Sequence, residues 1–361
     1  MWSSSVAPGV ARPISVNSQF SGRNYPVALR STQTYMTELL NVGIIGLGVM
    51  GQRMLTRLAD HPRLRVTHIW DADPRTVMRT MASYPQLKPV ANAEALIATP
   101  GLASLYIATP PGPHMALSNL AFNANLAVFC EKPLTVDFDA ARRTIERIGR
   151  EGQRGAVNFS LASSPGLAAL QGAWQERPEG FLGEPREASI ELAFASWPRP
   201  WQAAAGDWLS ERAEGGFTRE VLSHFVFVLQ RVLGPVVVRS SNPVYPPDGH
   251  GAETALSAQL EASDVPIAVH ARVGGDVDDF NRMTLRGTTG EIELREWFGV
   301  YRRREGGRWD TLGDPAELRT RGQIDQLLQW VALIEGRPHS LPDFAEALAV
   351  QVTIEALLAG T

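Results

Sequence analysis

The chain has 361 residues, of which 44% are hydrophobic, 20% are charged and 8% are aromatic. This length allows two domains with separate cores, and the composition excludes the disordered and collagen-like classes. With 34 basic and 38 acidic side chains the net charge is -4, so we expect neither a nucleic acid nor an anionic membrane as a partner.

Residues 1–36 are rich in Ser, Pro, Asn and Gly, and they show neither hydrophobic periodicity nor the apolar core of a secretion signal. We interpret them as a disordered extension or as the product of a mis-assigned start, because Met36 stands just before the first expected strand. The single cysteine, Cys130, lies in an apolar run, as a buried reduced thiol does. No stretch approaches the roughly 20 apolar residues of a membrane span, so we expect a cytoplasmic protein.

From residue 39 to about residue 159, short apolar runs alternate with amphipathic stretches. This alternation is typical of a parallel sheet covered by helices, so we predict a doubly wound α/β Rossmann domain over residues 37–157. The expected strands are 41–45, 64–70, 105–108 and 126–130, and the expected helices are 50–59, 74–83, 114–123 and 138–148.

A GxGxxG motif joins the first expected strand to the first expected helix. Gly46 would allow the tight turn, Gly48 would let the backbone approach a pyrophosphate, and Gly51 would allow close packing of helix on strand. Val49 and Met50 complete the motif at the helix N-terminus, which favours negative charge. The motif predicts a dinucleotide site; a turn without ligand, or a similar fold that binds a methyl donor, is the alternative.

Asp71 stands 20 residues after Gly51, at the end of the second expected strand. A carboxylate at this place accepts hydrogen bonds from ribose hydroxyls and repels a 2'-phosphate, which predicts NAD as cofactor. Arg75 lies near enough to leave NADP as an alternative.

After residue 158 the pattern changes to closely spaced alternating segments linked by turns. The expected strands are 188–194, 254–260, 267–273, 282–287 and 291–294, followed by helices at 323–334 and 342–358. We predict a C-terminal α+β domain over residues 158–361, with a large, mainly antiparallel sheet of which one face is open to solvent or used in assembly.

Four motifs together resemble the Gfo/Idh/MocA family, the glucose-fructose oxidoreductases and inositol dehydrogenases. They are the glycine turn, Ala108-Thr109-Pro110-Pro111 followed by His114, Glu131-Lys132-Pro133, and Gly215-Gly216 leading to Glu220-Val221-Leu222-Ser223-His224. The tail, with Glu335-Gly336-Arg337-Pro338 and Ala345-Glu346-Ala347-Leu348, is also similar to that of the family. The likeness covers nearly all of residues 40–360.

The resemblance implies three catalytic residues. Lys132 would position and polarise the reacting oxygen, with a cis peptide before Pro133, and His224 would move the proton. Glu220 would assist, although the family more often has aspartate there. Because Glu220 and His224 are four residues apart, they share one face of a helix. A solvated lysine and a hydrogen bond along a helix face are the structural alternatives.

The resemblance also places further residues beside the cofactor. Thr109 and Pro110 would line the nicotinamide-ribose side through backbone contacts, and Glu131 and Lys132 would border it. His114 either lies near the cofactor or caps the turn after residue 113.

Residues 158–165 depart from the family pattern, since they hold no arginine or tyrosine where many relatives have one. Trp197, Trp201 and Trp208, with Arg199 between them, form an aromatic loop that either contacts substrate or serves packing.

Together these features predict an NAD(P)-dependent oxidoreductase that acts on a sugar, cyclitol or related small polyol. We expect no metal, and by analogy with relatives we expect a homodimer or homotetramer. A regulatory dinucleotide-binding protein on the same fold, and a reductase of a non-sugar carbonyl or conjugated double bond, are the alternatives.

Overall fold

A computed structural model of the protein describes residues 38–275 and 278–360, without the side chains of residues 203–205. The prediction for residues 1–36 lies outside these ranges. None of the described helices is long and apolar enough to span a membrane.

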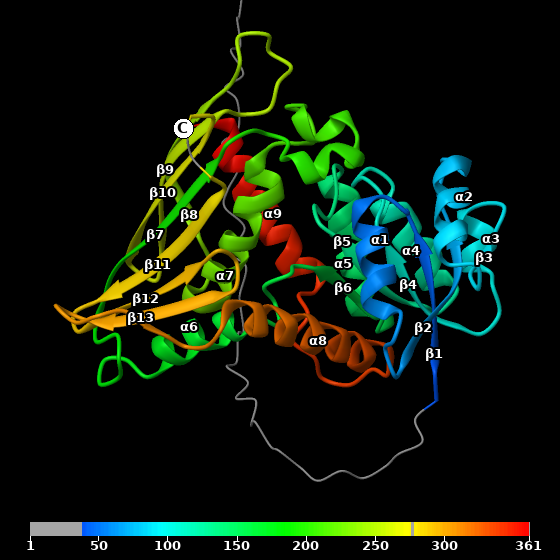
Figure 1. Ribbon diagram of the computed structural model, residues 1–361, viewed down its shortest axis with the longest axis horizontal. Coiled ribbons are helices and arrows are strands. Elements are labelled where there is room, and N and C mark those ends of the chain that lie inside the picture. Colours follow the sequence, from blue (N-terminus) through cyan, green and yellow to red (C-terminus); the bar gives the residue numbers. More distant parts are fainter. Residues whose placement is uncertain (1–37, 276–277, 361) are drawn as a thin grey trace, which may run out of the picture. The chain divides into compact units, whose positions relative to one another are not determined.

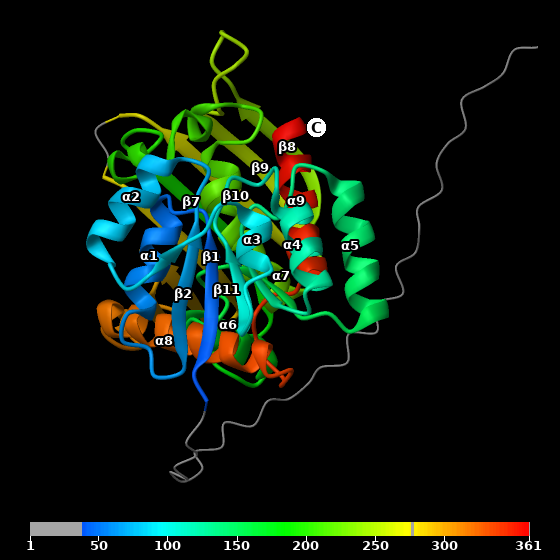
Figure 2. The ribbon, with the colours of Figure 1, turned by 90° about the vertical axis from the view of Figure 1, so that its right-hand side faces the viewer.

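The first sheet has six parallel strands in the order β3-β2-β1-β4-β5-β6. This is the strand order of the Rossmann fold, and Figure 2 shows helices on both sides of the sheet. The strands are β1 Leu40–Ile45, β2 Leu64–Trp70, β3 Lys88–Pro89, β4 Leu102–Ile107, β5 Ala127–Glu131 and β6 Gly155–Asn158. The connecting helices are α1 Val49–Leu58, α2 Pro74–Ser83, α3 Ala93–Ile97, α4 His114–Asn123 and α5 Phe138–Glu151.

Local sequence signals account for the ends of these helices. Asp73 caps α2 by accepting a hydrogen bond from the Arg75 amide, and Pro74 occupies the first helical position. Asp137 caps α5 in the same way, and Gly152 ends that helix in the left-handed conformation. The strands β5 and β6 are buried along their whole length, as expected for parallel strands covered on both faces.

The second sheet has eight strands in the order β14-β13-β12-β11-β7-β10-β9-β8. All neighbouring pairs are antiparallel except β7 and β10, which confirms the predicted fold class. The strands are β7 Pro185–Phe194, β8 Val237–Val244, β9 Ala255–Ala262, β10 Val265–Val273, β11 Phe280–Gly287, β12 Gly290–Arg295, β13 Gly299–Arg304 and β14 Asp310–Thr311. The helices of this half are α6 Pro165–Gln175, η1 Pro200–Ala205, η2 Asp207–Ser210, η3 Thr218–Leu222, α7 Ser223–Leu233, α8 Pro315–Ile334 and α9 Phe344–Ala359.

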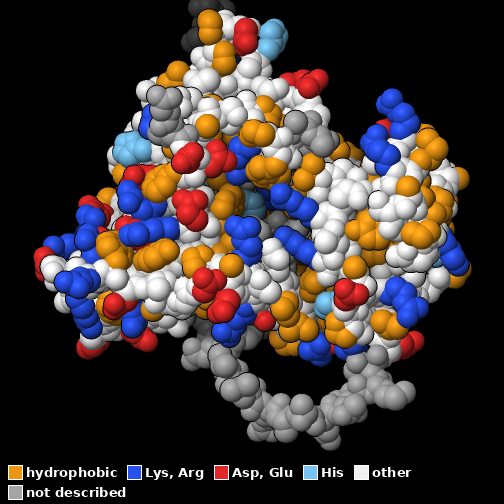
Figure 3. All heavy atoms as spheres, viewed as in Figure 1, with side chains coloured by type: hydrophobic (Ala, Val, Ile, Leu, Met, Phe, Trp, Pro, Cys, Tyr) orange, Lys and Arg blue, Asp and Glu red, His pale blue; other side chains and the backbone are white. Residues whose placement is uncertain are grey.

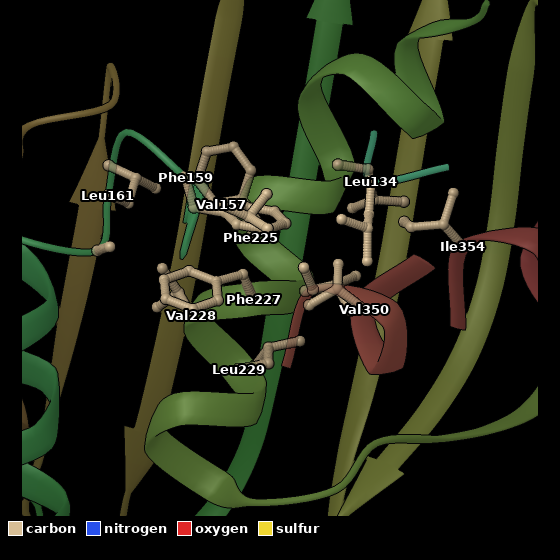
Figure 4. Close-up of a cluster of buried hydrophobic side chains, with 14 of the residues drawn as sticks. Leu134, Val157, Phe159, Leu161, Phe225, Phe227, Val228, Leu229, Val350 and Ile354 are labelled. Carbon is tan, nitrogen blue, oxygen red and sulfur yellow. The ribbon is translucent and has the colours of Figure 1, made fainter. Parts of the chain in front are cut away.

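One face of this sheet is covered by helices, with α7 and α9 beside it in Figure 1. Phe225, Phe227 and Val228 of α7 pack there with Val350 and Ile354 of α9 in one apolar cluster (Figure 4). The opposite face carries the alternating polar residues of the strands and cross-strand ion pairs. These pairs are Arg282–Glu191, Arg286–Glu187 and Arg239–Glu261.

Helix α8 begins at Pro315, eight residues before the predicted start, because Asp314 caps it and the first turns lie on the surface. Its C-terminal half packs on the first sheet, so a helix late in the sequence completes the Rossmann core. The Trp330 side chain is fully buried against the rings of Tyr106 and Phe129, and its Nε1 donates to Ser104 Oγ at 3.0 Å.

We expect Trp330→Ala to lower the free energy of unfolding by about 3–5 kcal/mol, since it removes a fully buried ring and leaves a cavity. Urea denaturation measures the change. The control is Ile324→Ala on the same helix, where the side chain is 54% exposed, and it should shift stability by about 0.5 kcal/mol or less. Equal effects of the two substitutions would show that α8 does not depend on this contact.

Candidate active site

The glycine turn between β1 and α1 has the geometry of a phosphate-binding site. Gly46 has φ +91°, and a Cβ there would lie 2.5 Å from the Ala108 carbonyl carbon. A Cβ on Gly51 would lie 2.1 Å from the Gly46 oxygen, whereas Gly48 faces open space with nothing within 4 Å. Val49 and Met50 are the first residues of α1. The residues present therefore fit a pyrophosphate at the start of this helix.

Asp71 lies beside this turn, at the end of β2. One carboxylate oxygen accepts from the Leu47 amide at 2.7 Å and the other from the Asp73 amide at 2.8 Å. Arg75 extends into solvent, with 81% of its side chain exposed, and pairs with Asp73 at 3.2 Å. The Asp71 carboxylate is thus placed where the ribose hydroxyls of a bound dinucleotide would meet it. The Arg75 guanidinium is held by Asp73, the N-cap residue of α2.

His114 links the loops that follow β4 and β5. Its ring is fully buried, with Nε2 at 2.9 Å from the Thr109 carbonyl and Nδ1 at 3.0 Å from the Pro133 carbonyl. Burial lowers the pKa of His114 below its usual value. Both ring nitrogens face the backbone, so His114 holds the two loops together, and Pro110 continues the first of them.

Glu131 ends β5 with its carboxylate turned into the protein interior. It accepts hydrogen bonds from the Tyr106 hydroxyl and from Asn158 Nδ2, the latter at 2.6 Å. Gln326 of α8 extends this network by donating to Asn158 Oδ1 at 2.8 Å. Burial raises the pKa of both Glu131 and Tyr106. The side chain that the sequence placed beside the cofactor therefore anchors the strand that precedes Lys132.

Lys132 and Glu220 come together although 88 residues separate them. The Lys132 ammonium lies 2.6 Å from Glu220 Oε2 and 3.3 Å from the Glu220 carbonyl oxygen. Only 9% of the lysine side chain and 12% of the glutamate side chain are exposed. The Lys132–Pro133 peptide bond is cis, as the family resemblance predicts.

A π-helical turn over Thr218–Leu222 carries Glu220 and leads into α7, which carries His224. The Ser223 amide bonds to the Thr218 carbonyl five residues back, so the helix is wider here than the regular α-helix that the sequence suggests. Single π turns of this kind recur at functional sites.

The His224 ring is buried between two aromatic side chains, Phe159 at 5.5 Å and Trp297 at 5.3 Å, both edge-on. Burial and the positive charges of Lys132 and Arg199 hold the pKa of His224 well below 6.5. The imidazole is therefore neutral at neutral pH and able to accept a proton.

Three buried polar atoms of this site have no hydrogen-bond partner among the described residues: Thr109 Oγ1, Glu220 Oε1 and His224 Nδ1. Buried polar groups are normally satisfied. One of them belongs to Glu220, whose other oxygen contacts the Lys132 ammonium, so this site offers free polar atoms to a ligand that carries hydroxyl or carbonyl groups.

Two residues of the site, Trp297 and Arg199, were not assigned a role there from the sequence. Trp297 lies in the turn after β12 with φ +72°, and nothing local marks it. Arg199 was noted only as part of an aromatic loop; the structure buries its side chain beside the rings of Trp197 and Trp201.

A family model described as the oxidoreductase family with an NAD-binding Rossmann fold, GFO_IDH_MocA, matches residues 40–159. Residues 40–159 thus match the NAD-binding Rossmann domain of the Gfo/Idh/MocA family. The protein is an NAD-binding oxidoreductase, as predicted.

Curated relatives match the chain over different lengths. It is 24% identical to the inositol 2-dehydrogenase of Acidothermus cellulolyticus over 332 residues, which cover 89% of this chain and 94% of the relative. It is 30% identical to the inositol 2-dehydrogenase of Pseudomonas fluorescens over 149 residues, which span 40% of this chain but only 44% of that relative.

The fold is similar to that of an Agrobacterium radiobacter oxidoreductase solved with NAD+, L-tartaric acid and magnesium. The TM-score is 0.75 at 17% identity, covering 88% of this chain and 94% of that one.

Gly46→Ala tests the cofactor turn. We expect it to weaken NADH binding at least about tenfold, because the methyl group both strains a left-handed residue and displaces the loop after β4. Fluorescence titration with NADH measures this. Gly101→Ala is the matched control, since Gly101 has φ +79° but open space around it, so it bears the backbone strain alone. Similar weakening in both variants would refute a specific role for the turn.

Proposed function

We propose that the protein is a dehydrogenase that transfers hydride between the nicotinamide of NAD, or of NADP, and a carbinol or carbonyl carbon of a sugar, cyclitol or related small polyol. One observation supports this proposal: at the carboxyl edge of the Rossmann sheet, the nearly buried Lys132 ammonium pairs with Glu220, and four residues later the buried His224 has an Nδ1 without a partner among the described residues. The inositol 2-dehydrogenases among the relatives support the substrate class.

The bound dinucleotide would supply the hydride donor or acceptor, and the protein residues would bind and orient both reactants. The glycine turn with Val49 and Met50 would hold the pyrophosphate, and Asp71 the adenine ribose. Thr109 and Pro110 would border the nicotinamide side.

Lys132 would stabilise the negative charge that develops on the reacting oxygen during oxidation of the alcohol. Glu220 holds the ammonium at 2.6 Å, and its second oxygen would accept a hydrogen bond from a neighbouring hydroxyl of the substrate. His224 would remove the hydroxyl proton as general base, a role that its lowered pKa supports.

We further propose that residues 37–157 bind the cofactor, that residues 158–361 shape the substrate pocket, and that the protein works in the cytoplasm as a homodimer or homotetramer. The open face of the second sheet and the buried free thiol of Cys130 support this assignment. Sedimentation that gives a monomer would contradict the oligomeric part.

The direct test is a fluorescence titration with NADH and NADPH, followed by turnover assays on sugars, cyclitols and their keto forms. Binding with turnover of one such compound supports the proposal. Binding without any turnover favours a regulatory protein, and turnover restricted to non-sugar carbonyls favours the other alternative.

Lys132→Met should lower kcat by about 10²–10³-fold while NADH binding persists, because it removes a charge at the reacting oxygen. Steady-state kinetics and NADH titration measure the two effects. The control is Lys88→Met, which changes the exposed one of only two lysines in the chain. Because the single variant leaves Glu220 buried and unpaired, Lys132→Met/Glu220→Gln should regain thermal stability but not activity. Turnover restored with stability would overturn the catalytic role.

His224 should determine the acid limb of the pH profile. Since its pKa lies below 6.5 and the neutral imidazole is the base, kcat/KM for alcohol oxidation should be full at neutral pH and fall as pH drops through that lowered pKa. His224→Gln should reduce kcat/KM and abolish this limb. His250→Gln, at an exposed position, should leave it in place. An identical acid limb in His224→Gln would argue against the assignment.

A further inference from the structure

Arg199 is the buried arginine of the described chain, with 8% of the residue exposed. Other partly buried arginines of this half pair with carboxylates: Arg219 contacts Glu355 at 2.7 Å, and Arg231 contacts Glu346 at 2.5 Å. Within residues 38–275 and 278–360, no carboxylate lies within 4 Å of the Arg199 guanidinium. Burying a charge without a counterion costs folding free energy, so the burial of Arg199 needs an explanation.

The guanidinium is held in place by uncharged groups. Its carbon lies 4.7 Å from the ring centre of Trp201 and 5.6 Å from those of Trp197 and Phe194. Its Nε donates to Gln202 Oε1 at 2.9 Å. These contacts fix its orientation, but they supply no full negative charge.

Contacts on two sides place the loop with Arg199 between helix α1 and the turn that carries Glu220. Arg53 of α1 also lies over the Trp201 ring, at 4.1 Å, so the loop lies on the helix that follows the glycine turn. Phe194 and Trp197, which lie beside the Arg199 guanidinium, also contact the ring of Phe217, at 5.7 and 6.2 Å. Phe217 directly precedes the π-helical turn that carries Glu220. Basic side chains gather around a hollow in the middle of the face shown in Figure 3.

The carboxylates of this region have other partners or are exposed. Glu220 is already paired with Lys132 at 2.6 Å, Glu131 is bonded to Tyr106 and Asn158, and Asp279 is exposed. Among the described residues, the buried Arg199 guanidinium therefore has no carboxylate of its own. Bidentate binding of a carboxylate would neutralise the guanidinium with good geometry.

We propose that Arg199 binds a carboxylate of the substrate, so that the dehydrogenase proposed above, on which this inference rests, acts on a polyhydroxy acid in preference to a neutral polyol. The carboxylate would lie against the guanidinium, and a hydroxyl of the same molecule would reach Lys132 and His224. A single guanidinium suits a monoanion better than a phosphate dianion.

The test compares matched pairs that differ only at C1: D-gluconate with D-glucitol, and D-galactonate with D-galactitol. Binding is measured by calorimetry on the full chain saturated with NADH, and oxidation is assayed with NAD. We expect an aldonate to bind at least about tenfold more tightly than its alditol. Equal binding within both pairs, absence of aldonate binding, or tighter binding of glucose 6-phosphate would overturn the proposal.

Variants separate charge recognition from loop packing. Arg199→Gln should weaken aldonate binding about 10- to 100-fold and leave alditol and NADH binding unchanged, and Arg199→Lys should recover part of the loss. Arg212→Gln is the control, since Arg212 is exposed and stacks on Tyr245 at 3.8 Å. Equal losses for both ligands, or a loss of NADH affinity, would instead assign Arg199 to packing or to the cofactor phosphates.

The two proposals fail in different ways. Aldonate binding that depends on Arg199 without turnover of any compound would keep the anion site and remove the dehydrogenase. Turnover of neutral polyols without aldonate binding would keep the dehydrogenase and remove the anion site.

Discussion

The ion pair between Lys132 and Glu220 joins the loop after β5 to the π-helical turn before α7, with 2.6 Å between its charged atoms. Both side chains are nearly buried, so removing either partner would leave a charge that the interior cannot solvate. The pair therefore restrains two elements from opposite halves of the chain. His224 follows one helical turn later, and His114 holds the loop after β5 against the loop after β4. This contact between the two halves of the chain therefore sets the positions of Lys132, Glu220 and His224.

Next to this ion pair, the core of the Rossmann domain holds β5, the strand that ends just before Lys132. Glu131 is locked by Tyr106 and Asn158, and Gln326 brings α8 into the same network. Trp330, one turn later on α8, packs under the same part of the sheet. Rigid support of this kind would keep the Lys132 ammonium within the small range of positions that the proposed hydride transfer tolerates. The position of Lys132 thus depends on a helix nearly two hundred residues away in sequence.

Features that follow from short-range sequence patterns were predicted, whereas features that depend on tertiary contacts were missed. The parallel strands β1, β2, β4 and β5 were predicted from their apolar runs, whereas β3 and β6, with two and four residues, were missed because they are short. The glycine turn and Asp71 were found because their spacing is local. The edge strand β8 was missed because its polar residues lack clean alternation, with Arg239, Ser240 and Ser241 in succession. The π turn, the contact of Trp297 with His224 and the burial of Arg199 arise only when distant segments pack together.

Lysine occurs at only two positions of this arginine-rich chain, and the nearly buried one, Lys132, pairs with Glu220. A compact ammonium has three donors that can be shared between Glu220 and a substrate oxygen, whereas a guanidinium fork would commit to one planar partner. Arginine suits position 199 for the opposite reason, since stacking holds its plane fixed. Both positive charges lower the pKa of His224, and an anion bound at Arg199 would offset one of them. Substrate charge and the proton affinity of the base are therefore coupled through the same guanidinium.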